Sequence, residues 1–294
     1  MASTRALRLL TAALAAALLV IGLACDDEDA GPEPSPTVER PTAGPTEPPT
    51  APPAGGVWSP GPGTTWQWQL QGDIDTSLDV AAYDIDLFDV PQATIDALHA
   101  EGRTVICYFS AGSLEEGRPD EGEFAPDDAG EQLENWPDER WLDVRSSNVR
   151  RITEQRLDMA VAKGCDAVEP DNVDAYDNNN GFDLAEADQL DFNRFLADAA
   201  HARGLSVGLK NALGLVDALV PSFDWALNEE CVAYEECGAL APFIDAGKAV
   251  FHVEYVDEEE DGEALRDAVC ADPTVAGFST LIKTPDLLVW GLAC

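Results

Sequence analysis

The sequence predicts an α/β fold, a single (β/α)8 TIM barrel that follows a disordered N-terminal tether. Short runs rich in β-branched and aromatic residues alternate with stretches of helical periodicity, and glycine follows several of the helical stretches. Polar residues gather where the β-rich runs end. Strands joined through helical crossovers pair in parallel. Eight of them in a chain of this length imply a closed barrel, with a doubly wound sheet as the alternative.

Eight β-rich runs are the predicted barrel strands: residues 65–70, 83–88, 104–109, 165–169, 205–209, 224–227, 249–253 and 277–282. Between them, residues 91–101, 148–163 and 190–203 have apolar side chains three and four positions apart, which predicts helices. Gly102, Gly164 and Gly204 follow these helices directly. Glycine adopts the left-handed conformation that ends a helix, so these positions are predicted helix ends.

Residues 1–24 predict a lipoprotein-type signal peptide. Two arginines precede an apolar run at residues 9–23, which is too short for a comfortable membrane span. The sequence Gly22-Leu23-Ala24-Cys25 resembles a bacterial lipoprotein cleavage box, although leucine usually occupies the place of Gly22. We therefore expect an exported protein, lipid-anchored through Cys25 to a bacterial membrane and facing the periplasm or the exterior. Ordinary secretion with cleavage nearby is the alternative.

Residues 25–57 predict a disordered linker. They consist of proline, threonine, alanine, glycine and acidic residues, with almost no large apolar side chain. Such a segment cannot bury enough surface to offset the entropy lost on ordering. Residues 58–294 are long enough for one sizeable core and form the predicted barrel domain, which we expect to be monomeric.

The formal net charge is −39, from 56 acidic and 17 basic residues. Nucleic acid is excluded as a partner, because phosphate binding needs a basic face. Two interpretations of the acidity remain open. It provides general solubility, as in a salty habitat where self-repulsion is screened, or it attracts a cationic substrate.

Six cysteines remain besides Cys25, and an even number in an exported domain predicts disulfides. We expect Cys231–Cys237 because this pair closes a short loop, and Cys270–Cys294 because this pair would tie down the C-terminus. Cys107–Cys165 then remains by elimination. The sequence has no C-x-x-C pair and only three histidines, so we expect no structural zinc site. It also lacks the glycine-rich motifs of nucleotide-binding proteins, and we expect no cofactor.

The ends of the predicted strands carry carboxylates, aromatic side chains and amides. The run at 165–169 leads into Glu169, Asp171, Asn172 and Asp174. In a barrel, the carboxyl ends of the strands form the rim that holds the active site. Sugar hydrolysis uses this mixture of side chains, because one carboxyl protonates the leaving oxygen and another attacks or activates water. A divalent-metal hydrolase on the same rim and a non-catalytic carbohydrate-binding lipoprotein remain as alternatives.

Five segments at strand ends resemble glycoside hydrolase family 114, the endo-α-1,4-polygalactosaminidase family. They are residues 108–112 (YFSAG), 171–174 (DNVD), 209–211 (LKN), 228–237 (NEECVAYEEC) and 251–255 (FHVEY). The resemblance extends from about residue 66 to residue 294. It implies a TIM-barrel enzyme that cleaves α-1,4-linked galactosamine in a partly deacetylated, cationic polysaccharide, without a metal.

The resemblance assigns Asp171 as the nucleophile and Glu229 as the general acid/base, and it implies retention of configuration with carboxyl groups about 5–5.5 Å apart. The expected substrate contacts are Asp86, Tyr108, Asn172, Lys210, Asn211, Glu254 and Tyr255. One departure is Glu169-Pro170, where apolar residues are expected. Pro170 lacks an N–H group, so we expect a local bend, and Glu169 becomes a rival for the nucleophile.

Overall fold

The computed structural model describes residues 56–294. The predicted signal peptide, the lipidation site at Cys25 and nearly all of the predicted linker lie outside the described residues. No helix in the described part of the chain is both long and apolar enough to cross a membrane.

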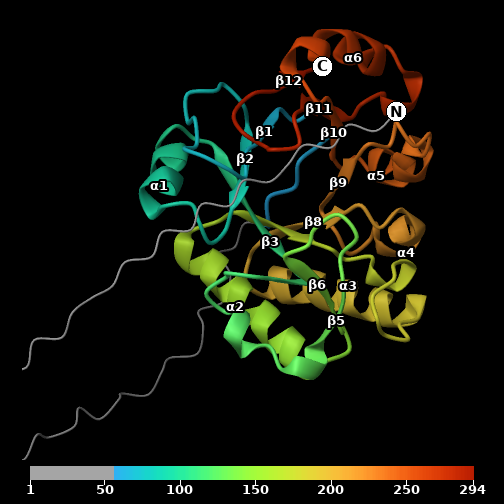
Figure 1. Ribbon diagram of the computed structural model, residues 1–294. Helices are drawn as coiled ribbons and strands as arrows, with labels where there is room; N and C mark the ends of the chain where they lie inside the picture. Colours follow the sequence, from blue (N-terminus) through green and yellow to red (C-terminus); the bar gives the residue numbers. More distant parts are fainter. Residues whose placement is uncertain (1–55) are drawn as a thin grey trace, which may run out of the picture. The chain divides into compact units, whose positions relative to one another are not determined.

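A nine-stranded sheet forms the centre of the described part (Figure 1). Its spatial order is β1-β2-β3-β7-β8-β9-β10-β11-β12, and all neighbours are parallel except the last pair. The strands are β1 (Trp66–Trp68), β2 (Ala82–Asp86), β3 (Thr104–Ser110), β7 (Ala167–Asp171), β8 (Ser206–Lys210), β9 (Trp225–Glu229), β10 (Val250–Tyr255), β11 (Ser279–Lys283) and β12 (Leu292–Ala293). Each predicted run contains or overlaps one of the eight parallel strands. The sheet curls so that Trp66 of β1 donates from Nε1 to the carbonyl of Ser279 in β11, 2.8 Å away, as a (β/α)8 barrel requires.

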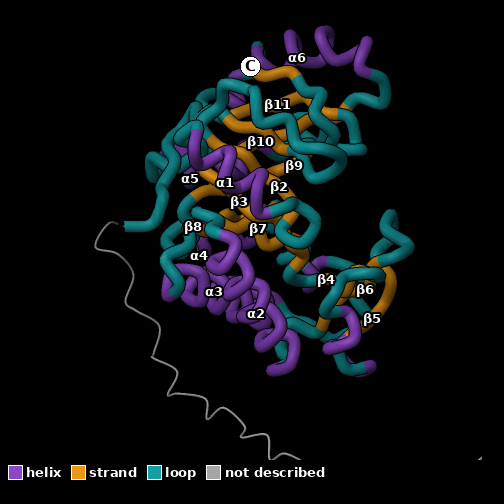
Figure 2. Tube along the Cα trace, turned by 90° about the vertical axis from the view of Figure 1, so that its left-hand side faces the viewer, coloured by secondary structure: helices purple, strands orange, loops and turns teal. Residues whose placement is uncertain are grey.

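The helices lie around these strands (Figures 1 and 2). They are α1 (Gln92–Ala100), α2 (Ser147–Lys163), α3 (Glu186–Ala202), α4 (Val216–Leu219), α5 (Ala241–Asp245) and α6 (Gly262–Cys270). The prediction of the first three is confirmed, and α3 begins four residues earlier than expected. Gly102, Gly164 and Gly204 have φ values of 74°, 84° and 77°. The predicted left-handed helix ends are therefore confirmed.

A small antiparallel sheet lies between β3 and α2, and the sequence analysis did not predict it. Its strands are β4 (Ser113–Glu115), β5 (Ala129–Gln132) and β6 (Glu139–Leu142), in the order β4-β6-β5. Figure 2 shows it standing apart from the large sheet. These strands are only three or four residues long, so they carry too little alternation to be recognised as strands.

The interior of the barrel is filled from alternate strand positions, as the two-residue period of a strand requires. Near the amino ends of the strands, the rings of Trp66, Trp225 and Phe251 pack together, with Phe251 4.6 Å from Trp66 and 5.2 Å from Trp225 between ring centroids. Gly208 leaves space for the Trp225 ring, because a Cβ at this position would lie 2.2 Å from it. Aromatic side chains therefore close this end of the barrel.

Two further expectations concern the end of strand β7 and the pairing of the cysteines. Strand β7 continues through Pro170 in register with β3, and pairing with β8 includes only Ala167 and Val168. Pro170 has no N–H to donate, so the hydrogen bonding of β7 to β8 ends there while the strand itself continues. The prediction that the strand stops at Glu169 is therefore wrong. All three predicted disulfides are present: Cys107–Cys165, Cys231–Cys237 and Cys270–Cys294.

Candidate active site

A cleft of about 1240 Å³ opens at the carboxyl ends of the parallel strands. Inward-facing positions at the ends of the strands form its floor, because alternation along each strand directs every second side chain into the barrel. The predicted site residues that line it are Asp86, Tyr108, Asp171, Asn172, Lys210, Asn211, Glu229 and Tyr255. The sequence analysis placed all of them at strand ends.

Lys210 is the central charge of the site. Its ammonium nitrogen lies 2.7 Å from Glu169 Oε1, 3.2 Å from Glu229 Oε2 and 3.5 Å from Asp171 Oδ2. It also lies 4.5 Å above the centroid of the Trp68 ring, within cation–π distance. Burial lowers the pKa of this lysine, but the surrounding carboxylates outweigh that effect and raise it well above its ordinary value. Lys210 is therefore a fixed cation that joins three acids.

Glu169 lies beneath the floor of the cleft. It is fully buried, accepts a hydrogen bond from Trp68 Nε1 at 3.2 Å, and pairs with Lys210. Burial raises its pKa to about 7, and Lys210 acts against that rise. Because it does not line the cleft, it is a poor rival for the nucleophile role.

Asp84 is the deepest carboxyl of this network. Burial and the neighbouring charge of Glu169 raise its pKa well above the ordinary value, which favours its neutral form. No donor from the described residues reaches either of its oxygens, and in its protonated form Asp84 has a hydrogen to donate to the neighbouring Glu169. The neutral form of Asp84 leaves Glu169 and Lys210 as the ion pair of the buried network.

Asp171 ends β7 with both oxygens positioned. Oδ1 accepts the backbone N–H of Asn172 at 2.6 Å, and Oδ2 accepts the Tyr108 hydroxyl at 3.2 Å. These donors and Lys210 hold the carboxylate in one orientation. Asp171 is thus an oriented carboxylate on the floor of the cleft, the state that a nucleophile requires.

Glu229 ends β9 on the other side of Lys210. Its Oε1 accepts the Tyr255 hydroxyl at 2.5 Å, and its Oε2 accepts Asn211 Nδ2 at 3.1 Å. Burial raises the pKa of Glu229, but Lys210 and the hydrogen bonds from Tyr255 and Asn211 more than offset it, so the pKa is lowered. In the free site this glutamate is an anion.

Three of the strands that carry the site are followed by a non-glycine residue in the left-handed region. Asn172 has φ 60°, Asn211 has φ 45° and Glu230 has φ 61°. Such conformations cost about 1–3 kcal/mol each and concentrate at functional sites. They turn the chain sharply immediately after Asp171, Lys210 and Glu229, which holds these side chains at the rim.

Two expected substrate contacts have other partners. Asp86 lines the cleft, but Arg118 binds it at 2.7 Å and the backbone N–H groups of residues 88 and 89 also donate to it. Glu254 is not brought to the cleft, so this prediction is wrong. It accepts from His252 at 2.9 Å and from the N–H of Val232 at 2.7 Å. Phe251, Val253 and Tyr255 belong to the interior cluster, so alternation directs Glu254 outward and could have shown this beforehand.

The small sheet contributes residues that the sequence analysis missed. Glu115, Arg118, Trp136 and Glu139 all line the cleft. Arg118 binds Glu115 at 2.8 Å as well as Asp86, and burial raises the pKa of Glu139 to about 7. No motif marks these residues. Their one signal is the length of the connection between β3 and α2, since long structured loops in a barrel commonly belong to the site.

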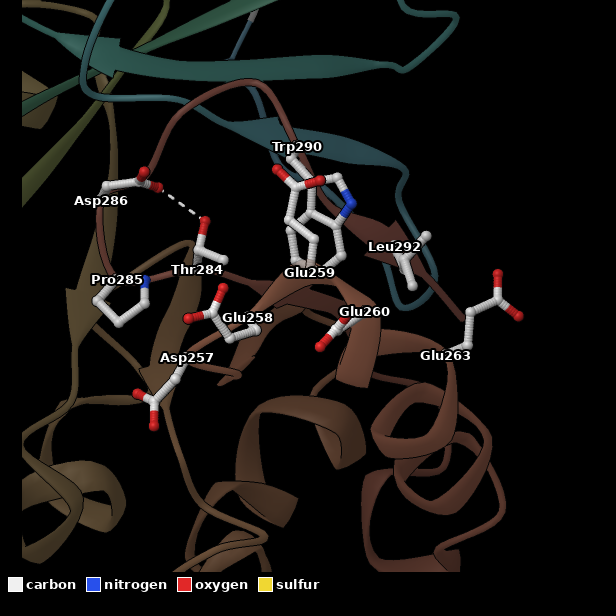
Figure 3. A pocket seen from close by; sticks show the side chains of 10 residues that line it. All are labelled: Asp257, Glu258, Glu259, Glu260, Glu263, Thr284, Pro285, Asp286, Trp290 and Leu292. Atoms are coloured by element: carbon white, nitrogen blue, oxygen red, sulfur yellow. Dashed lines mark hydrogen bonds between the residues drawn. The ribbon is translucent and has the colours of Figure 1, made fainter.

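A second hollow adjoins the cleft and shares Asp257 and Pro285 with it. Its lining is acidic, with Trp290 and Leu292 as apolar members (Figure 3). Figure 3 shows its carboxylates spread along the loops, with the Thr284 hydroxyl bonded to Asp286 at 2.7 Å. The acids do not converge on one point in this view, so the hollow extends the acidic surface of the cleft.

In the described part of the chain, the side chains of one group lie close enough together to bind a metal ion: Cys231, Cys237 and His252. The two cysteines form a disulfide, so their sulfurs are not thiolates and cannot bind a metal in this state. The carboxylates of the cleft floor are instead held by the ammonium of Lys210.

Comparison with known proteins identifies the family. The model of glycoside hydrolase family GH114 matches residues 47–294. The crystal structure of Ega3 from Aspergillus fumigatus, in complex with galactosamine, is 46% identical with a TM-score of 0.78, and the match covers 82% of this chain and 99% of that chain. The glycoside hydrolase domain of PelA from Pseudomonas aeruginosa is 14% identical with a TM-score of 0.60, covering 79% and 99%, which shows a common fold. No curated protein matches. The chain belongs to glycoside hydrolase family GH114 and is a glycosidase.

Proposed function

We propose that the protein is a retaining glycosidase that cleaves α-1,4-galactosaminidic bonds in a cationic amino-sugar polysaccharide, with Asp171 as nucleophile and Glu229 as general acid/base. The observation that carries this proposal is the position of Lys210, whose nitrogen lies 3.5 Å from Asp171 and 3.2 Å from Glu229. Two carboxylates that share one cation face the same small volume. Their nearest oxygens are at most roughly 7 Å apart, a range that includes the ~5–5.5 Å of retaining enzymes.

In the first step, Asp171 attacks the anomeric carbon while Glu229 protonates the leaving oxygen. In the second, Glu229 takes a proton from water, and that water displaces Asp171. Tyr108 and the N–H of Asn172 hold the attacking carboxylate in one orientation. Orientation of this kind lowers the barrier, because the reacting groups need not be ordered during the reaction.

Glu229 must hold a proton to act as an acid, yet its pKa is lowered in the free site. A bound sugar excludes water from the cleft, and desolvation favours the neutral carboxyl. We infer that substrate binding raises the pKa of Glu229 and that the free enzyme works best on the acidic side of neutrality.

The substrate class follows from charge and from relatives. The cleft contains more carboxylates than cations, and the whole chain has a net charge of −39. An acidic cleft concentrates cationic ligands near it. Ega3, at 46% identity, was crystallised with galactosamine. Both observations support a polymer whose amino groups are at least partly free.

Asp171→Asn and Glu229→Gln test the proposal. We expect each to lower hydrolysis of deacetylated galactosamine polymer by roughly 10²–10⁴-fold, with the fold intact by circular dichroism. Asp177→Asn and Glu235→Gln remove the same charge from exposed positions and serve as controls. Activity like that of the wild type in either site variant would refute the assignment. Proton NMR of the first product distinguishes retention from inversion, and full activity after exhaustive chelation would exclude the metal-dependent alternative.

We also propose that the protein is exported and lipid-anchored through Cys25, on the basis of the sequence preceding that residue. Metabolic labelling with a radioactive fatty acid is expected to mark the wild-type protein and not Cys25→Ala. The Cys25→Ala protein should also leave the detergent phase on phase separation. Labelling of Cys25→Ala at the wild-type level would refute the anchor.

A further inference from the structure

The small sheet places two glutamates directly opposite each other at the edge of the cleft. Strands β4 and β6 are antiparallel, and Glu115 is the register partner of Glu139. Both side chains line the cleft. Like charges on directly opposed residues destabilise a sheet. Such an arrangement therefore needs a compensating cation or a functional reason.

The protein supplies a cation to one member of the pair. Arg118 binds Glu115 at 2.8 Å, and Arg156 lies 4.0 Å from the same carboxylate. Glu139 forms no ion pair with any residue of the described part, and its Oε2 accepts the Ser113 hydroxyl at 2.5 Å. Its other oxygen, Oε1, accepts no hydrogen bond from the residues that the structure describes. Within the β4–β6 pair, Glu139 is thus the carboxylate without a cationic partner among those residues.

Hydrogen bonds connect this carboxylate to the nucleophile. Ser113 Oγ lies 2.6 Å from Ser110 Oγ, and Asn172 Nδ2 donates to Ser110 Oγ at 2.9 Å. The backbone N–H of Asn172 in turn donates to Asp171 at 2.6 Å. Glu139 is therefore held at a fixed position relative to Asp171, as a residue that recognises part of the same substrate must be.

An aromatic surface lies in the same part of the cleft. Trp136 precedes β6 by three residues, lines the cleft, and leaves 60% of its surface exposed. A single exposed aromatic side chain is ordinary on a protein surface, but this one lines the cleft, where a ligand can pack against it. Indole rings carry the apolar face of a sugar and attract a nearby cation. A carboxylate without a cation beside an exposed indole fits an amino sugar.

We propose that Glu139 is a specificity-determining residue that binds the protonated amine of a galactosamine unit packed on Trp136. This inference rests on the proposed function and assigns the recognition of the free amine to the β4–β6 sheet. The ammonium would donate to the free oxygen of Glu139, while Ser113 holds the other oxygen. An N-acetylated unit has no positive charge and gains nothing from this contact.

The charge of Glu139 makes the preference depend on pH. Burial raises its pKa to about 7, and the facing carboxylates Glu115 on β4 and Asp171 on β7 contribute, while Ser113 and Arg118 act in the opposite direction. Below that pH, Glu139 takes up a proton and loses its attraction for an ammonium group. The preference for free amines is thus expected to decline as the pH falls through about 7, and Glu139→Gln should not show this decline.

The test compares kcat/KM for two oligosaccharides of equal length, one fully deacetylated and one fully N-acetylated. For Glu139→Gln we expect kcat/KM to fall roughly tenfold or more on the deacetylated oligomer, as for a lost hydrogen bond to a charged group, and to stay unchanged on the acetylated one. Glu116→Gln removes the same charge from an exposed position of the same segment and should behave like the wild type. An equal loss on both oligomers, or an equal loss in Glu116→Gln, would overturn the inference.

Binding separates this inference from the proposed function. Calorimetry with the Asp171→Asn protein measures affinity for the deacetylated oligomer without turnover, and adding Glu139→Gln should weaken it roughly tenfold or more. Unchanged affinity would reject the role of Glu139 even if the wild type cleaves the polymer. If the wild type cleaves neither oligomer, the proposed function fails, and the affinity difference still decides whether Glu139 binds the amine.

Discussion

The two halves of the barrel interior are built on the same strands and differ completely in chemistry. Near the amino ends, Trp66, Trp225 and Phe251 form an apolar plug. On six strands, a small or apolar inward residue is followed two positions later by an aromatic or ionisable one. The pairs are Ala82 and Asp84, Ile106 and Tyr108, Ala167 and Glu169, Gly208 and Lys210, Leu227 and Glu229, and Val253 and Tyr255. One strand period, about 6.6 Å, separates the two members of each pair.

This difference shows how stability and function are divided. The apolar half stabilises the fold through the burial of side chains that need no hydrogen-bond or ion-pair partner. The ionisable half is buried almost as deeply, so its charges need partners, and Lys210 supplies a positive charge beside three carboxylates. We expect substitutions in the apolar half to change stability alone and substitutions in the ionisable half to change both stability and activity.

Lys210→Met should have the largest effect. It leaves Glu169 buried without a cation, which is expected to lower the free energy of unfolding by about 3–5 kcal/mol and to abolish activity. Urea denaturation at neutral pH measures the loss. Adding Glu169→Gln to Lys210→Met removes the stranded charge and should restore part of the stability but none of the activity. No recovery in the double variant would mean that the two residues are not energetically coupled.

Phe251→Ala tests the apolar half. Removal of this ring leaves a cavity between Trp66 and Trp225, which is expected to lower the free energy of unfolding by about 3–5 kcal/mol. The value of kcat/KM for the folded fraction should stay within a few-fold of the wild-type value, because the ring packs in the apolar cluster and does not line the cleft. A loss of activity comparable to that of Lys210→Met would show that the two halves are not independent.

Tyr255→Phe tests the electrostatics of the catalytic floor with little change in packing. The Tyr255 hydroxyl helps to keep the pKa of Glu229 low, so its removal raises that pKa. The protonated acid then persists to higher pH, and the alkaline limb of the kcat/KM profile should move upward by less than about one pH unit. Tyr234→Phe, at an exposed position, is the matched control. A limb that does not move, or moves to lower pH, would contradict the role of Glu229 as acid.

The smallest effect is expected at the amino ends of the strands. His201 on α3 lies 2.8 Å from Asp224, which also accepts the N–H of Val207. The hydrogen bond to Asp224 raises the pKa of His201, although burial acts against it. This stabilisation is complete below the unfolded value of about 6.5 and is lost as the pH rises through the folded pKa. The melting temperature should decline slightly between about pH 6 and about pH 8, and His201→Gln should lack that decline. An identical decline in His201→Gln would assign it to other groups.

Much of this architecture was predictable from sequence, for identifiable physical reasons. The eight parallel strands were found because their buried runs are bounded by helices that end in glycine, and the left-handed φ of Gly164 is the physical basis of that signal. Asp171, Lys210 and Glu229 were placed at the rim because they end strands, and the resemblance to family 114 singled out Asp171 and Glu229 among the acids there. Their actual arrangement around one ammonium was not predictable, since strand order does not fix how far a lysine side chain reaches.

The errors have equally specific causes. Glu254 was assigned to the cleft from its position near a strand end, although its parity along β10 directs it outward. Glu139 was missed because β4, β5 and β6 are too short to show alternation. Glu169 was treated as a rival nucleophile because sequence alone does not reveal whether an acid at a strand end lies above or below the floor.

The Cys107–Cys165 bond ties β3 to the residue that precedes β7 by two positions. The whole connection that carries the small sheet and α2 lies inside this covalent loop. Tyr108 directly follows Cys107, and Asp171 ends the strand that begins just after Cys165, so the two stay side by side even when the enclosed segment changes. The enclosed segment, which lines part of the cleft, can therefore be lengthened, shortened or replaced while the nucleophile and its tyrosine stay aligned.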